Sequence, residues 1–299
     1  MSIDAMREVA HRLLVSTGAL AAFGAVLQQR IDSVPVSQEL EVRLMEVLRI
    51  LGIDEELEGV STEALATLLA EIRLTFLQGV KLLYSPALQP GWTHTEVELL
   101  LSQGQASAAI ASLFQRVVIP QLDGLATRLS APTASFLDVG VGVATISIAM
   151  AQLWPALQVV GIDPWEPALA QARRQVATAG LEDQIELRQQ AVEDLTDSAV
   201  FDLVWFSTPF IRADVLVLAL QRVWHALRPG GWIFLGILNT TDEPLAAAFA
   251  DLRSVYWGGQ PLMPKAGRVL LEERGFDQVQ EFVSPPSALA TLVVGRRPL

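Results

Sequence analysis

The stretch FLDVGVGVAT, residues 136–145, decides the fold. Its apolar start predicts a strand that ends at Asp138, and Gly140 and Gly142 allow a tight turn into a helix. Such a turn exposes bare backbone, and the helix that follows offers unpaired N–H groups to a ligand. A Gly-x-Gly pair also occurs in turns that bind nothing, but the strand–turn–helix context favours a ligand site.

Short apolar runs alternate with helical segments from Ala134 onward. The expected strands include SFLDVG, LQVVGID, IELRQ, FDLVWFS and GWIFLGIL, and the expected helices cover residues 145–153, 167–179, 214–227, 245–255 and 269–274. This alternation predicts a doubly wound, mostly parallel α/β sheet with helices on both faces. The segments FDQVQEFVS and ALATLVVGRR are expected to form an antiparallel hairpin at the sheet edge. We assign residues 131–299 to this domain.

Residues 1–130 show helical periodicity and are assigned to an all-helical cap. Helix entries are expected at Ser61 and at Thr93, which is followed three residues later by Glu96 as in a capping box. Gln103-Gly104-Gln105 is expected to break the second of these helices. The apolar run LLVSTGALAAFGAVL, residues 13–27, is expected to be a buried bundle helix rather than a signal or anchor, because it is short and interrupted.

Composition limits the possible functions. The formal net charge is -12, which disfavours nucleic acid and anionic membrane surfaces as partners. The 299 residues include no cysteine and three histidines, so thiolate chemistry is excluded and we expect no metal centre. The lack of cysteine agrees with a cytoplasmic location.

Asp138 and Asp163 discriminate between cofactors. Asp163 ends the second expected strand about twenty residues after the glycines, where an acidic side chain binds ribose hydroxyls; capping of the next helix is the alternative. A dinucleotide fingerprint requires Gly or Ala where this chain has Thr145. Asp138 would oppose a pyrophosphate but attract an amino-acid ammonium, although it can also bind nearby backbone amides. These residues favour S-adenosylmethionine.

Residues 134–236 resemble the class I methyltransferases, the Rossmann-like family that uses S-adenosylmethionine. FLDVGVGVA, VVGIDP, AVEDL, FDLVWFSTPF and LRPGGWIFLG resemble five of their motifs in order, and the helical N-terminus resembles bacterial natural-product methyltransferases with a helical cap. The resemblance implies a seven-stranded sheet. It also implies that Pro164 or Trp165 flanks the adenine of the cofactor and that Val192 and Glu193 lie at the edge of the adenine. Ser207 would then lie beside the methionine portion. The family often has Asp at the position of Ala191, so the adenine amino contact is expected from Glu193 or backbone.

The acceptor side offers weaker signals. His94 is the candidate base or substrate contact, with an exposed loop histidine as the alternative. Trp92, Phe210, Tyr256 and Trp257 are candidate pocket residues, with a purely structural aromatic plug as the alternative. The nearby cations Arg212, Arg253 and Lys265 are expected to be solvated at the surface.

The combined interpretation is methyl transfer from S-adenosylmethionine, with S-adenosylhomocysteine as product, to a small, largely apolar phenol, carboxylate or polyketide-like metabolite. The alternatives are a non-catalytic or cyclase-type relative that binds the same cofactor, and an NAD(P)-dependent oxidoreductase. Excess apolar surface on the helices predicts a homodimer.

Overall fold

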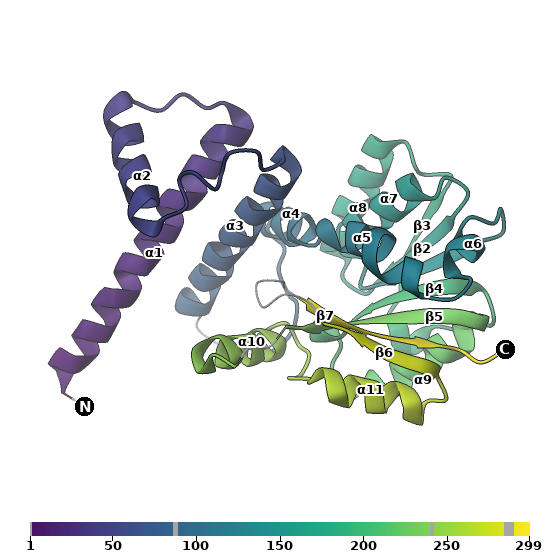
Figure 1. Ribbon diagram of the computed structural model, residues 1–299. Helices are drawn as coiled ribbons and strands as arrows, with labels where there is room; N and C mark the ends of the chain where they lie inside the picture. The colour runs from purple at the N-terminus through teal and green to yellow at the C-terminus, as the bar shows by residue number, and fades with distance from the viewer. Residues whose placement is uncertain (1, 86–88, 240–241, 284–289) are drawn as a thin grey trace. The chain divides into compact units, whose positions relative to one another are not determined.

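The computed structural model describes residues 2–85, 89–239, 242–283 and 290–299, and these residues form two compact units (Figure 1). One unit is Met1–Ser85 with Gln105–Ala109, and the other is Pro86–Gly104 with Ile110–Leu299. This division differs from the boundary expected at residue 130. Most of residues 86–130 therefore belongs to the α/β unit rather than to the helical one.

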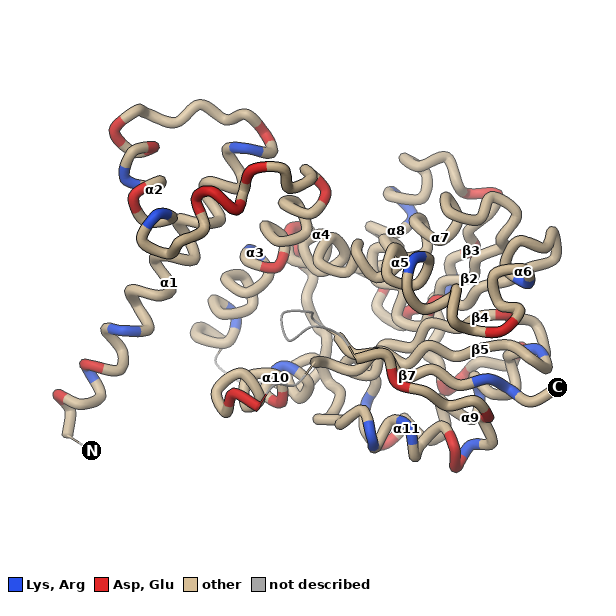
Figure 2. The backbone as a smooth tube through the Cα atoms, in the orientation of Figure 1, with Lys and Arg blue, Asp and Glu red and all other residues tan. Residues whose placement is uncertain are grey.

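Three helices make up most of the first unit: α1 (Ile3–Asp32), α2 (Gln38–Leu51) and α3 (Thr62–Tyr84). Each begins after a serine whose hydroxyl accepts a backbone N–H, and the third of these is the expected entry at Ser61. The apolar faces meet in one cluster: Val26, Leu27, Leu48, Leu57, Leu65, Leu69 and Ile72. The connection between α2 and α3 carries four acidic residues at 54–56 and 58, and Asp and Glu are red in Figure 2.

The expected burial of α1 holds only for its second half. Gly24, Val26 and Leu27 are buried, whereas apolar side chains of the first half are exposed, among them Leu13 and Leu14. The prediction for residues 13–27 was therefore wrong at its N-terminal end, because α2 and α3 cover only the later turns. By length and composition alone, α1 is the one described helix that is long and apolar enough to cross a membrane.

The chain continues with α4 (Val97–Ala106), α5 (Ala109–Leu113), the π-helical segment η1 (Phe114–Val118), the 3-10 turn η2 (Ile119–Gln121) and α6 (Leu125–Leu129). All of these residues except Gln105–Ala109 belong to the second unit. Two sequence predictions fail here. The helix starts at Val97 rather than at Thr93, and it runs through Gly104 instead of breaking there. A Cβ atom at Gly104 would lie 2.2 Å from Val143 Cγ2, so this glycine permits close packing onto the glycine-rich turn.

The sheet confirms the predicted architecture. Seven strands lie in the order β3-β2-β1-β4-β5-β7-β6. The parallel strands are β1 (Ser135–Val139), β2 (Gln158–Asp163), β3 (Ile185–Gln189), β4 (Phe201–Ser207) and β5 (Leu227–Leu238). β6 (Asp277–Phe282) and β7 (Ala290–Arg296) form the expected antiparallel pair, although positions 284, 288 and 289 of the predicted hairpin lie outside the described residues.

Helices cover both faces of this sheet. Alternate residues of β1 enter two separate cores: Phe136 packs with residues of α7 (Thr145–Leu153) and α8 (Glu166–Ala179), while Leu137 packs with α9 (Leu216–Ala226) and α11 (Pro264–Glu273). α10 (Pro244–Tyr256) and the turns η3 (Val192–Asp194) and η4 (Thr208–Phe210) complete the unit. The carboxyl ends of the parallel strands, where folds of this kind bind ligands, carry the predicted site residues.

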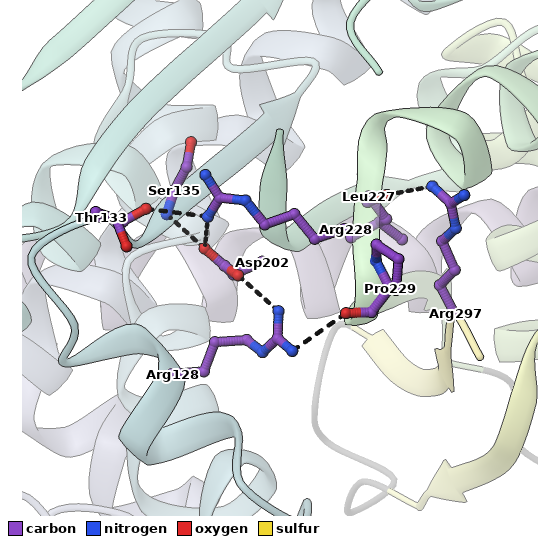
Figure 3. A network of polar contacts seen from close by, with 8 residues as sticks. All are labelled: Arg128, Thr133, Ser135, Asp202, Leu227, Arg228, Pro229 and Arg297. Atoms are coloured by element: carbon purple, nitrogen blue, oxygen red, sulfur yellow. Dashed lines mark hydrogen bonds and ion pairs between the residues drawn. The ribbon is translucent and has the colours of Figure 1, made fainter. Parts of the chain in front are cut away.

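An ion cluster ties together the opposite, amino-terminal edge of the sheet (Figure 3). The buried Asp202 carboxylate accepts from the Ser135 N–H at 3.0 Å, from Arg128 at 2.9 Å and from Arg228. Arg128 also donates to the Pro229 carbonyl at 3.1 Å. A buried carboxylate is costly unless it is fully paired. The groups that pair Asp202 come from α6, β1 and β5, so the cluster joins these elements to β4.

Candidate cofactor and acceptor site

The turn after β1 has the shape that a ligand cradle needs. Gly140 and Gly142 have φ values of 74° and 56°, in the left-handed region that favours glycine. The N–H groups of Gly140 and Val141 both donate to the Ile162 carbonyl, at 2.9 and 3.0 Å, which fixes the turn against the end of β2. A Cβ at Gly140 would meet no atom within 4 Å, so open space lies beside this backbone. The turn therefore fits a ligand that approaches the main chain.

Asp163 links this turn to the start of α8. Its carboxylate accepts from the Gly142 N–H at 3.0 Å and from the Trp165 N–H at 2.8 Å. Burial raises the pKa of Asp163, and the two backbone hydrogen bonds partly oppose that shift. The expected position at the end of β2 is correct, and each carboxylate oxygen keeps acceptor capacity for a ribose hydroxyl.

Asp138 is more enclosed than the sequence suggested. It is 1% exposed, and its carboxylate accepts from the Ser147 hydroxyl at 2.7 Å, in the first turn of α7. Burial raises the pKa of Asp138 to about 7; the Ser147 hydrogen bonds lower it, and the charge of Asp163 raises it further. Asp138 thus holds the helix that follows the turn. This role is structural, like the alternative of binding nearby backbone amides, but the partner is the Ser147 hydroxyl. Attraction of an ammonium group stays a prediction.

Residues 91–96, which we call the strap, are held at both ends. The Gly91 N–H donates to the Tyr256 carbonyl at 3.2 Å, and a Cβ at Gly258 would lie 2.9 Å from the Gly91 Cα, so the two backbones touch. At the other end, the Trp165 indole N–H donates to the His94 carbonyl at 2.6 Å. The strap therefore spans from α10 to the end of β2, beside Asp163.

The strap brings together the aromatic residues that the sequence singled out. Trp92 makes edge contacts with His94, Phe210 and Trp257, with ring centres 4.7, 5.2 and 6.1 Å apart. His94 also lies 5.9 Å from Tyr256. His94 is buried, so the alternative of an exposed loop histidine is wrong. The five rings pack against one another, as a structural plug would, and they do so at the carboxyl edge of the sheet.

The remaining residues predicted to bind the cofactor differ in burial and contacts. Trp165 packs with Leu100, Val143 and Ala168, and Pro164 is exposed. Val192, the first residue of η3, is buried in the core, so its side chain serves packing. Glu193 is partly exposed, and its carbonyl accepts from Arg222 at 3.1 Å. Ser207 is partly exposed at the last position of β4.

Sequence reasoning missed three contributors to this site. Ser147 holds Asp138, and the available signal was a serine between two isoleucines in the first turn of α7. Gly104 allows α4 to pack closely on Val143. Arg253, expected to be solvated, is partly buried with its guanidinium carbon 4.5 Å from the Trp257 ring centre. The i, i+4 spacing of these two residues at the end of α10 was the available signal.

Comparison with known proteins agrees with this geometry. Residues 136–231 match the family described as methyltransferase domain. The α/β unit has the class I methyltransferase fold. The methyltransferase domain implies S-adenosylmethionine as cofactor, and the open glycine turn with Asp163 fits that molecule.

Relatives of known sequence and structure extend the similarity. A ubiquinone biosynthesis O-methyltransferase of Xanthomonas campestris pv. campestris is 31% identical over 174 residues, which cover 58% of this chain and 66% of that protein, slightly less than two thirds of its length. An O-methyltransferase family protein from Burkholderia thailandensis has a TM-score of 0.66 at 14% identity over 100% of this chain and 98% of its own. Human N-acetylserotonin methyltransferase, solved with S-adenosylmethionine, has a TM-score of 0.60 at 15% identity, covering 99% of this chain and 98% of its own. These structures share the fold of the methyltransferase domain.

Proposed function

We propose that this protein transfers a methyl group from S-adenosylmethionine to an oxygen of a small, largely apolar acceptor. The observation that carries the proposal is the strap, which the indole of Trp165 holds beside Asp163 and which supplies Trp92 and His94 to the aromatic cluster. The similarity to O-methyltransferases supports transfer to oxygen. Phenols are the acceptor class that aromatic side chains suit best, with carboxylates and polyketide-like metabolites as the other candidates.

The chain's own residues would align the reactants and remove a proton. Bound S-adenosylmethionine supplies an activated methyl carbon, so the main task of the protein is to orient the acceptor in a dry site. Of the three histidines of the chain, His94 is the buried one, and His11 and His225 are exposed. An imidazole nitrogen of His94 would accept the proton of the acceptor hydroxyl, since imidazole titrates near neutral pH.

Labelled methyl donor tests this function directly. The full chain is incubated with radioactive S-adenosylmethionine and a panel of phenols, carboxylic acids and amines. We expect labelled phenol ethers, and His94→Gln is expected to lower kcat about a hundredfold with cofactor affinity unchanged, as for loss of a general base. His225→Gln, on an exposed histidine of α9, is the matched control.

The panel also separates the rival functions. Conversion of a compound without loss of the donor's methyl group would indicate a cyclase-type relative. Tight binding of NADH but not of S-adenosylhomocysteine in calorimetry would indicate an oxidoreductase. Binding of S-adenosylmethionine without methylation of any panel member contradicts the proposed activity.

We further propose that the protein acts in the cytoplasm, in the biosynthesis of a natural product, as a homodimer. The dimer is supported by exposed apolar side chains on the helical unit, among them Leu13 and Leu14 of α1 and Leu83 of α3. Light scattering coupled to size-exclusion chromatography measures the mass directly, and a mass of 32.5 kDa, that of one chain, would remove this part of the proposal.

A further inference from the structure

Trp257 is held rigidly within the aromatic cluster. Its side chain is nearly buried at the end of α10, with 3% of the residue exposed. The ring stacks on Phe210 with a centre-to-centre distance of 4.8 Å and an angle of 6°, and Arg253 also lies over the ring. These contacts fix the plane of the indole and therefore the direction of its N–H bond.

The indole N–H of Trp257 has no hydrogen-bond partner among the residues that the structure describes. An indole nitrogen can only donate, and a buried donor without an acceptor destabilises the fold. Native proteins pair nearly all such groups, so an exception needs an explanation. A ligand that brings its own acceptor atom would provide one.

Trp224 offers an internal comparison. Its indole N–H is likewise buried and unpaired within the described part of the chain, and Arg297 lies over its ring at 4.1 Å. Trp224 is on α9, however, and the Arg297 side chain donates to the carbonyl of Leu227, where β5 begins. Its surroundings belong to the amino-terminal edge of the sheet, away from the cofactor turn.

The place of Trp257 in the fold is different. Phe210, on which it stacks, closes the turn η4 directly after β4. A Cβ at Gly259 would lie 2.5 Å from the Pro209 carbonyl oxygen, so the end of α10 touches that turn. The unpaired donor thus stands at the carboxyl edge of the sheet, on the side where the acceptor is expected.

We propose that the Trp257 indole N–H donates a hydrogen bond to an oxygen of the methyl acceptor, next to the atom that receives the methyl group. The acceptor is then a planar aromatic hydroxyl compound with a neighbouring ether, carbonyl or hydroxyl oxygen. This inference rests on the proposed methyl transfer. It makes Trp257 the residue that distinguishes such compounds from phenols without the second oxygen.

Nitrogen NMR of the indole groups tests the contact without turnover. The full chain, with ¹⁵N-labelled tryptophan and saturating S-adenosylhomocysteine, is titrated with 2-methoxyphenol and with 2-ethylphenol, which has a methylene in place of the ether oxygen. The Trp257 signal is assigned by its loss in Trp257→Phe. We expect its proton to move downfield with 2-methoxyphenol only. An unchanged signal, or equal shifts with both compounds, overturns the proposal.

Kinetics tests the consequence for selectivity. Trp257→Phe keeps a ring that can stack on Phe210, and we expect it to lower kcat/KM about tenfold for the ether-bearing phenol and to leave 2-ethylphenol unchanged. A purely structural role would lower both values equally. Trp224→Phe is the matched control, because it removes a second indole N–H that is buried and unpaired among the described residues. Melting temperature and S-adenosylhomocysteine affinity report whether each variant folds.

The two proposals fail in different ways. Methyl transfer that shows no difference between the wild type and Trp257→Phe refutes the role of Trp257 alone. Absence of transfer to every compound of the panel refutes the methyl transfer itself. If another phenol is the better acceptor, that phenol and its counterpart with a methylene in place of oxygen form the matched pair.

Discussion

Replacing Asp138 by Asn should make the free protein more stable at neutral pH and its cofactor binding weaker. The pKa of Asp138 is raised by burial from 3.8 to about 7. Because the folded pKa lies above the unfolded one, the folded protein binds more protons between these pH values, and stability falls as pH rises through about 7. From pH 5 to pH 8 this single group removes about 2–3 kcal/mol from the free energy of unfolding.

The variant Asp138→Asn lacks this titration and nearly matches the shape of the original side chain. We therefore expect the wild type to lose stability relative to the variant as the pH rises. The unfolding free energy of the variant minus that of the wild type should increase by about 2 kcal/mol from pH 5 to pH 8. Urea unfolding at both pH values measures this difference. A difference that does not change with pH would show that Asp138 does not titrate in this range.

Cofactor binding should depend on pH in the opposite sense. If the ammonium group of S-adenosylhomocysteine requires ionised Asp138, and the pKa in the free protein is about 7, then affinity rises about tenfold from pH 6 to pH 8. Calorimetry should also detect release of about half a proton at pH 7. 5′-Methylthioadenosine, which has no amino-acid tail, is the control ligand. An ammonium contact would be refuted if the affinities of both ligands for the wild type changed equally with pH. It would also be refuted if the affinity of Asp138→Asn for S-adenosylhomocysteine changed with pH as much as that of the wild type.

Three further substitutions have separable effects. Gly104→Ala places a methyl group against Val143, and we expect overpacking of about 1–3 kcal/mol, seen in urea unfolding together with weaker S-adenosylhomocysteine binding in calorimetry. Trp165→Phe removes the donor to the His94 carbonyl, so amide hydrogen exchange of residues 91–96 should accelerate about fivefold; unchanged exchange would mean that the strap is held elsewhere. Asp202→Asn leaves two arginines without their carboxylate and should lower the free energy of unfolding by about 3 kcal/mol, with cofactor affinity unchanged.

Local patterns predicted the α/β unit well because they repeat along the chain. The glycines of the first turn and the position of Asp163 follow from strand periodicity and from the geometry of parallel sheets, where carboxyl ends of strands meet at one edge. The same geometry explains why Phe210 and Trp257, distant in sequence, could be grouped as pocket candidates.

The failures share a cause, which is dependence on contacts between different elements of the fold. Gly104 resembles a helix breaker until Val143 is seen beside it. Thr93 and Glu96 match a capping box, but residues 92–96 are not helical, and the His94 carbonyl accepts from the distant Trp165 indole. The enclosure of Asp138 depends on Ser147 and on burial, and neither is visible in a spacing rule.

The short segment from Gly91 to Glu96 has one anchor on each flank, and this has a thermodynamic consequence. The Trp165 anchor neighbours Asp163, whereas the Gly91 anchor is shared with the turn that carries Trp257. If binding of adenosine shifts the Trp165 anchor, the strap couples the free energy of that shift to the Gly91 anchor. Linkage then requires the reverse as well: an acceptor that tightens cofactor binding must itself bind more tightly when the cofactor is present, by the same factor.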